Sequence, residues 1–165
     1  MPDFFTNNCQ EAPRSEPTFG LCDDSNNAPA YTNIADPETW IATVNNKSGL
    51  PVIFTAIDKC IIQDHEFEGR GRCDGMLTTT QHLYLVELKD RDYPGVIPAA
   101  VQQLVSTVEF LYEYHPKEVS AYRHKKIFAC NKRKPKSVEV DSARQKQFFD
   151  TYRFRIDIQA TVLML

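Results

Sequence analysis

The sequence predicts an α/β domain of the α+β type, in which helices flank a mixed sheet. Three strand-like runs, at residues 51–62, 72–77 and 83–89, follow one another without a helix between them. A long stretch at 97–114 then has apolar residues at spacings of three and four, which indicates a helix. Further strand-like runs come at 121–130 and 152–163. Elements grouped in this way favour a sheet with strands of both directions.

Length and composition fit one globular domain. The chain has 165 residues, of which 42% are hydrophobic and 25% are charged. No apolar run approaches the roughly 18 residues that span a bilayer. The N-terminus lacks the basic start and apolar stretch of a secretion signal. We therefore expect a cytoplasmic protein with no membrane partner.

The cysteines are odd in number and far apart in the sequence. No CxxC pair occurs, which argues against a zinc ribbon or a redox motif. Buried free thiols are the simplest expectation for all of them. The residues are Cys9, Cys22, Cys60, Cys73 and Cys130.

Charge is unevenly distributed along the chain, whose net charge is −3. Residues 1–69 carry 11 acidic and 3 basic side chains, whereas residues 70–165 carry 11 acidic and 16 basic ones. A weakly basic C-terminal part is compatible with nucleic-acid contact. This part lacks the strong excess of basic residues that is expected of a protein that binds nucleic acid tightly and without sequence preference.

The N-terminal part is expected to differ from the rest. Residues 1–35 are rich in Asn, Pro, Asp and Ser and lack a sustained period, so they predict an irregular arm, and residues 36–165 predict a single domain. Asp36-Pro37-Glu38 has the features of a helix start, with Asp as N-cap and Pro in the first turn. This helix would run to about Asn45, with Trp40, Ile41 and Val44 on one face.

The remaining elements follow in order. The three runs at 51–62, 72–77 and 83–89 are separated by polar turns and predict a meander of strands. Pro94 and Gly95 precede the helix at 97–114, and His115-Pro116 ends it. A fourth strand at 121–130, a basic loop at 131–136, a short helix at 141–149 and a last strand at 152–163 complete the chain.

The strand at 83–89 carries two charges at its end. Its side chains alternate, so that Tyr84, Val86 and Leu88 face one side and Leu83, Leu85, Glu87 and Lys89 face the other. Both faces are mostly apolar, which predicts a buried central strand. Burying a carboxylate and an ammonium group is costly unless they are paired or bind a metal.

A second carboxylate is expected beside Glu87. Asp74 lies 13 residues earlier, a spacing that a hairpin can close. Two carboxylates on neighbouring strands suit Mg²⁺ or Mn²⁺, and the backbone carbonyl of Leu88 would complete the ligand set. Lys89 would position or deprotonate a water and neutralise developing negative charge.

Asp74 followed by Glu87-Leu88-Lys89 resembles the D…(D/E)xK signature of the PD-(D/E)XK, or restriction endonuclease-like, superfamily. The element order helix, three-strand meander, helix, strand over residues 36–130 also resembles its core. The proline of the motif is absent, because Cys73 precedes Asp74. The resemblance implies a metal-dependent nuclease that hydrolyses phosphodiester bonds, with DNA as the expected substrate.

Relatives in this superfamily often add a glutamine from the helix after the ExK strand. Gln102 and Gln103 are the candidates here, and Gln103 is preferred. Some relatives also supply a glutamate from the first helix, for which Glu38 is the candidate in the expected helix. Six basic residues are candidates for phosphate contact, although charged loops are usually only solvated. They are Arg70, Arg72, Arg91, Lys132, Arg133 and Lys134.

Two other interpretations remain open. The chain could be an inactive member of the same fold that binds nucleic acid or protein, since a fold does not fix a function. It could also be a structural domain in which Glu87 and Lys89 form only an ion pair. The sequence leaves open DNA or RNA, cleavage within a chain or from its end, and a homodimer or protein partner.

Overall fold

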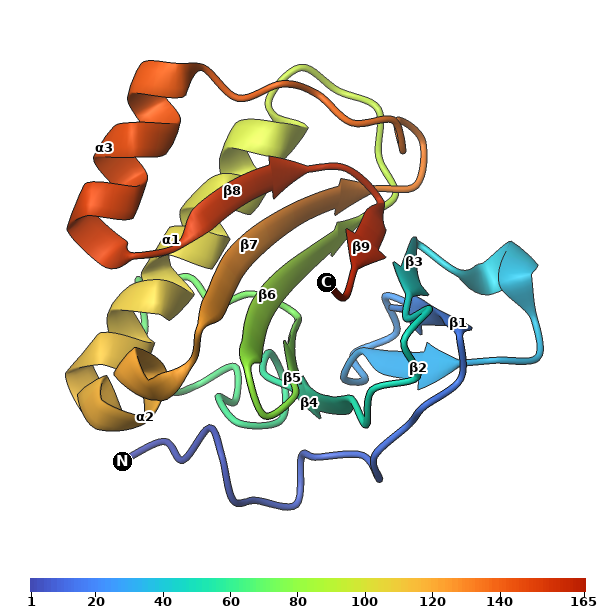
Figure 1. Cartoon of the computed structure of the whole chain (residues 1–165), viewed down its shortest axis with the longest axis horizontal. Helices are drawn as coiled ribbons and strands as arrows, with labels where there is room; N and C mark the ends of the chain where they lie inside the picture. The colour runs from blue at the N-terminus through green and yellow to red at the C-terminus, as the bar shows by residue number, and fades with distance from the viewer.

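A five-stranded sheet forms the centre of the protein, for which a computed structural model describes all 165 residues. Its strands, in spatial order, are β4 (Ile53–Ala56), β5 (Gly75–Thr78), β6 (His82–Lys89), β7 (His124–Asn131) and β8 (Arg155–Ile158). β4, β5 and β6 are antiparallel, and β7 and β8 then run parallel to β6 (Figure 1). The predicted meander and mixed sheet are therefore confirmed.

A second, four-stranded sheet lies against the first. It has the order β2 (Tyr31–Asn33), β1 (Thr18–Cys22), β3 (Ala42–Asn45) and β9 (Thr161–Leu163). Its first three strands are antiparallel, whereas β3 and β9 are parallel. The sequence did not predict this sheet. The protein is thus an α+β fold with two mixed sheets and three helices.

Three helices cover the other face of the central sheet. They are α1 (Val96–Tyr114), α2 (Pro116–Ala121) and α3 (Ser142–Tyr152), and Figure 1 shows them on the side opposite β1, β2 and β3. α1 forms because Val101, Leu104, Val108 and Leu111 line one side of it, and all four are buried. None of the helices is long and apolar enough to cross a membrane.

Two hydrophobic cores result from these three layers. One lies between the central sheet and the helices and contains Leu83, Leu85 and Leu104. The other lies between the two sheets and contains Tyr84, Val86 and Leu88. The side chains of β6 thus enter the two cores alternately, as the alternation in the sequence predicted. Glu87 interrupts the helix-facing side.

Three predicted elements are wrong. The helix expected from Asp36 to Asn45 is only a 3-10 turn, η1 (Pro37–Thr39), followed by β3. Ala42 and Val44 are buried while Thr43 is half-buried, so a period of two prevails over the helical spacing of Trp40, Ile41 and Val44. The arm at 1–35 contains β1 and β2, and the last strand at 152–163 is divided between β8 and β9.

The N-terminal arm is held against the central sheet. Its backbone pairs with the edge strand at Gln10 with Thr55 and at Arg14 with Val52. Phe4 enters the helix-side core, and its amide donates to the ring of His115. Figure 1 shows this segment passing beneath β4 and β5. The arm therefore protects a sheet edge that would otherwise expose unpaired backbone groups.

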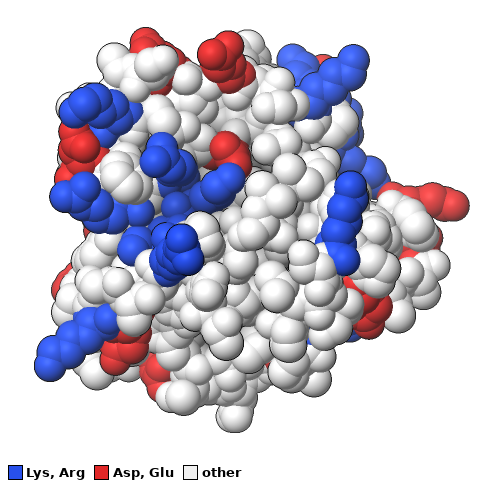
Figure 2. Space-filling view, in the orientation of Figure 1, with Lys and Arg blue, Asp and Glu red and all other residues white.

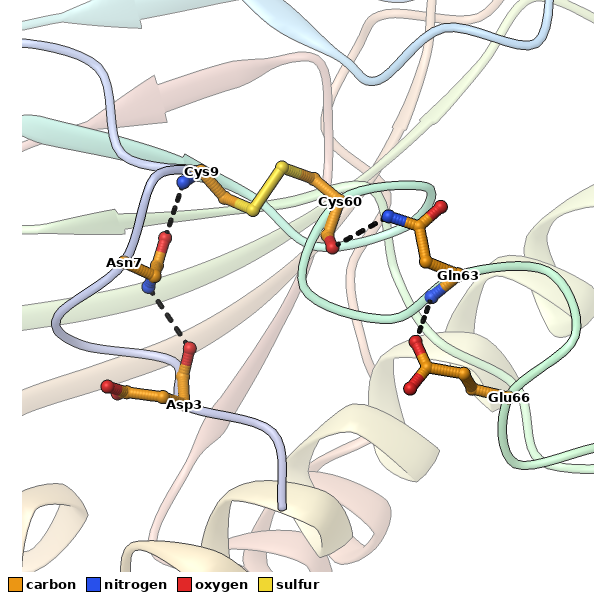
Figure 3. Close-up of a disulfide and its surroundings, with 6 residues drawn as sticks. All are labelled: Asp3, Asn7, Cys9, Cys60, Gln63 and Glu66. Carbon is orange, nitrogen blue, oxygen red and sulfur yellow. Dashed lines mark hydrogen bonds between the residues drawn. A yellow bond between two sulfur atoms is a disulfide. The ribbon is translucent and has the colours of Figure 1, made fainter.

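A disulfide between Cys9 and Cys60 fixes the arm, which corrects the expectation of five free thiols. Only Cys22, Cys73 and Cys130 are free, and all three are buried. Hydrogen bonds order the chain on both sides of the bridge (Figure 3). The Asn7 carboxamide accepts from the Cys9 amide, and the Gln63 side chain donates to the Cys60 carbonyl. Spacing alone could not reveal this pair, because the two cysteines are 51 positions apart in the sequence.

We predict that removing the disulfide destabilises the protein by about 2–4 kcal/mol, because the unfolded chain regains the entropy of a long closed loop. Cys9→Ala and Cys60→Ala should each lower the free energy of unfolding in non-reducing urea titrations. The double variant should cost no more than either single one, since each change alone breaks the bond. Additive costs would show that the two side chains act separately.

Candidate functional site

Glu87 lies near the end of β6 on the face that packs against α1. It is 3% exposed, and its neighbours on the same face, Leu83 and Leu85, belong to the helix-side core. Strand alternation forces Glu87 toward that core because its neighbours must be buried there. The carboxylate therefore depends on nearby polar groups for compensation.

Asp74 lies beside Glu87 on the neighbouring chain segment. The antiparallel register pairs Gly75 with Val86, which brings the preceding residue, Asp74, next to Glu87. The Asp74 amide donates to Glu87 Oε1 over 3.1 Å, and the Leu88 amide donates to Asp74 Oδ2 over 2.8 Å. Gly75 is needed here, because a Cβ would lie 2.4 Å from the Phe54 ring.

Lys89 joins Glu87 to α1. Its Nζ lies 3.0 Å from Glu87 Oε2 and donates to Gln103 Oε1 over 2.9 Å. Gln103 is thus the glutamine on α1 that faces the cluster, while Gln102 is exposed. The structure brings together Asp74, Glu87, Lys89 and Gln103 in one connected group.

This group lines a pocket of about 320 Å³. Two parts of the pocket lining were not identified as site residues from the sequence. Asp23 and Ser25 come from the loop between β1 and β2, and Ile41 precedes β3. Asp58, Asp90, Arg91 and Tyr93 complete the lining with the carboxylate cluster and Leu88. The only sequence signal for the first part is the acidic pair Asp23-Asp24, which lies in the segment expected to be irregular.

Burial dominates the electrostatics of the two carboxyls. It raises the pKa of Asp74 to about 7, although the hydrogen bond from the Leu88 amide opposes the shift. Burial also raises the pKa of Glu87 well above its ordinary value, and the charge of Asp74 adds to this shift. The ammonium of Lys89 acts in the opposite direction on the pKa of Glu87. Two adjacent negative charges are therefore disfavoured unless a cation joins them.

The oxygens of the pair fit a hard divalent cation as a partial ligand set. Asp74 Oδ2 accepts from the Leu88 amide. Glu87 uses both oxygens, one for the Asp74 amide and one for Lys89. No three histidine, cysteine, aspartate or glutamate side chains lie close enough to hold a metal among themselves. The two carboxylates and the Leu88 carbonyl would thus need water or substrate oxygens to complete coordination.

Most of the predicted phosphate-binding residues have partners within the chain. Arg72 pairs with Asp58 at 2.8 Å and with Asp64 at 3.0 Å. Arg70 pairs with Glu113 and stacks on Phe110. Arg133 pairs with Asp90, Lys134 pairs with Asp92, and Lys132 donates to the Glu38 carbonyl. Arg91 is the member of the predicted set that lines the pocket.

Glu38 does not contribute to the site. It is exposed in η1, and the pocket lining does not include it. The reason is that the expected first helix is absent, so no helix aims this carboxylate at the cluster. Asp58 lines the pocket and also pairs with Arg72.

Comparisons with known proteins return nothing: no family model, curated protein or solved structure matches this chain. The interpretation of the site therefore depends on its own geometry.

We predict that the stability of the protein falls as pH rises between about 4 and 7. The folded state holds the Asp74 proton up to a pKa of about 7, whereas the unfolded state releases it near the ordinary value of 3.8. The unfolded state therefore binds fewer protons in this window, and stability decreases with pH. Asp74→Asn removes this term and should melt above the wild type at pH 8, with a smaller gain at pH 5.

The matched control is Glu68→Gln, because Glu68 is exposed and forms no ion pair or side-chain hydrogen bond. Its melting temperature should follow that of the wild type at every pH. If Asp74→Asn showed the same difference from the wild type at pH 5 and pH 8, the raised pKa would be contradicted.

Proposed function

We propose that this protein is a metal-dependent nuclease that hydrolyses phosphodiester bonds, with DNA as the expected substrate. The observation that carries the proposal is a connected group at the end of a central strand, in which the buried Asp74 and Glu87 join the half-buried Lys89 and Gln103. Two carboxylates with raised pKa values and an adjacent lysine line a pocket that reaches solvent. Perturbed carboxyls in a pocket are typical of functional sites.

A restriction endonuclease-like core is part of the proposal. The meander of β4, β5 and β6, followed by α1 and the parallel strand β7, supports it. The 3-10 turn in place of the first helix departs from that core. The likeness therefore rests on the segment from β4 to β7, which also carries the D…ExK residues.

The residues would divide the work as follows. Asp74, Glu87 and the carbonyl of Leu88 would hold Mg²⁺ or Mn²⁺, which supplies charge stabilisation and activates water when bound. Lys89 would orient the attacking water and neutralise charge on the reacting phosphate. Gln103 fixes the ammonium of Lys89 from the side of α1, so that its position does not depend on Glu87 alone.

Several finer points belong to the same proposal. Structure-selective, non-specific or partner-directed cleavage is the expected mode. A homodimer or a protein partner would allow both strands of a duplex to be cut. The cytoplasmic location expected from the sequence stays a prediction, and the Cys9–Cys60 disulfide weighs against it, because disulfides persist mainly in oxidising compartments.

Cleavage tests the catalytic role of Lys89. We predict metal-dependent cutting of at least one substrate among plasmid, linear duplex, single-stranded DNA and RNA, and a loss of about 10²-fold or more in Lys89→Met. Methionine keeps the length and apolar stem of lysine, so the loss would report the missing ammonium. Lys47→Met, at an exposed turn after β3, is the matched control and should cut like the wild type.

Equal rates for Lys89→Met and the wild type would contradict the assigned role. If no substrate were cut while the metal still bound, the alternative of an inactive nuclease-fold module would be favoured.

Metal binding can be measured without catalysis. We predict that Mn²⁺ raises the melting temperature of the wild type, because a ligand that binds only the folded state stabilises it, by about 2.7 kcal/mol at 100 times the dissociation constant. Glu87→Gln should abolish the shift, while Glu68→Gln should retain it. No shift in the wild type would favour the interpretation of Glu87 and Lys89 as only a structural ion pair.

A further inference from the structure

A basic surface lies at the end of the central sheet opposite the carboxylate pocket. Figure 2 shows Lys and Arg side chains gathered over the start of β7, the start of β8 and the end of α3. We name this region the β7–β8 basic surface. Its residues are Arg123, Lys125, Lys126, Arg153 and Arg155.

These side chains surround the start of the β7–β8 ladder from both faces, with Lys125 on the helix side and Lys126 on the face of Tyr84. Lys126 and Arg155 are register partners in the β7–β8 ladder. Arg153 and Arg155 both lie over the ring of Phe149, at 5.5 Å and 4.5 Å from its centroid. Lys125 lines a pocket of about 490 Å³ together with Arg153, and Arg123 adjoins the strand through His124.

The positive charge of this surface is mostly uncompensated. Lys126 lies 3.2 Å from Asp157, but the other four cations form no ion pair. The Lys125 ammonium donates to the Tyr122 carbonyl, a neutral group. Burial, and then the charge of Arg153, lower the pKa of Lys125. An anion placed between Lys125 and Arg153 would offset the cost of burying the Lys125 charge and the repulsion between the two cations.

Arg153 occupies a position that glycine would adopt more easily. It ends α3 with its backbone in the left-handed region, at φ 64°, where helix C-termini usually carry glycine. Its amide still donates to the Phe149 carbonyl to cap the helix. The chain therefore keeps a guanidinium at the mouth of the pocket despite an unfavourable backbone angle.

One hydroxyl group of the lining is not already used. Ser120 has no side-chain hydrogen bond, whereas Thr151 donates to the Gln147 carbonyl and Tyr152 donates to Glu109, an acid that also lines the pocket. Hydroxyls and cations are the usual ligands of phosphate oxygens. Tyr112 and Tyr152 add aromatic surface beside them. This combination is typical of proteins that follow a nucleic-acid backbone.

We infer that the β7–β8 basic surface binds the phosphate backbone of a nucleic acid, with Lys125 and Arg153 as the central contacts. The choice of a nucleic acid among polyanions rests on the proposed nuclease function. The surface is distinct from the carboxylate pocket, because β6 and β7 run parallel and the two sites lie at opposite ends of that ladder. Lys125 is the register partner of Leu83, four residue steps before Glu87, so about 13 Å along the strand separates them, the rise of about four nucleotides.

Binding in chelator tests this inference without catalysis. Fluorescence anisotropy would be measured with labelled single-stranded and duplex 20-mers in EDTA, over a range of salt concentrations. The wild type should bind, and Lys125→Gln/Arg153→Gly should bind about tenfold or more weakly. The slope of log K against log salt should fall by about 2, because two phosphate contacts are lost.

Two comparisons separate binding from folding. Arg153→Gly should melt at or above the wild-type temperature, because glycine removes the unfavourable backbone angle while the capping amide remains. Lys47→Gln, which removes one exposed and unpaired cation from the turn after β3, should bind like the wild type. The inference is overturned if the wild type binds neither probe, or if the double variant binds as tightly as Lys47→Gln. Binding without cleavage in metal would instead contradict the proposed nuclease function alone.

Discussion

Two carboxyl groups, Asp74 and Glu87, are buried side by side, and much of the structure serves to make this possible. Each would be strongly disfavoured as an anion in an apolar interior. Backbone amides from Asp74 and Leu88 and the ammonium of Lys89 offset that cost. These donors are in place only because the β5–β6 register is fixed and α1 supplies Gln103 to hold the lysine.

The second sheet affects the site through the segments next to its strands, because the Asp74–Glu87 pair itself lies on the α1-facing side of the central sheet. It covers the face of the central sheet that α1 leaves open, so β6 has a core on each side. The same small sheet contributes Asp23, Ser25 and Ile41 to the wall of the pocket. A segment that is far away in the sequence thus sets both the polarity and the access of the site. The packing of the small sheet and the chemistry of the site cannot be changed independently.

The sequence was most informative for segments whose apolar residues follow a single repeat, either that of a strand or that of a helix. β6 lies between two cores, so its alternation is complete, and α1 packs on one side only, so its stripe is clear. Asp74 followed from hairpin geometry, whereas Gln103 was expected from the family resemblance, which implies a glutamine on the helix after the ExK strand. The segment at 36–45 misled because Trp40, Ile41 and Val44 also satisfy a helical spacing, while the pairing of β3 with β1 decides its state. Long-range pairing leaves no local signal.

Other features depended on contacts that no single segment reveals. Arg70 and Arg72 are of the residue type that contacts phosphate, but each forms an ion pair with an acidic side chain that folding brings near it. Cys9 and Cys60 are joined because the arm returns along β4. The β7–β8 basic surface combines the start of one strand with the end of a helix far along the chain. In each case the partner, and not the residue itself, determined the role.

The parallel pairing of β9 with β3 has a consequence for how the protein can be made. Thr43 pairs with Thr161, more than a hundred residues later. Val162 and Met164 then fill the core between the two sheets. During synthesis, β1 and β3 emerge from the ribosome long before β9. The edge of β3 that pairs with β9 therefore stays unpaired until β9 has been made. The small sheet therefore completes only after translation of this region ends, and a nascent chain held before residue 161 would expose that edge to chaperones and to other chains.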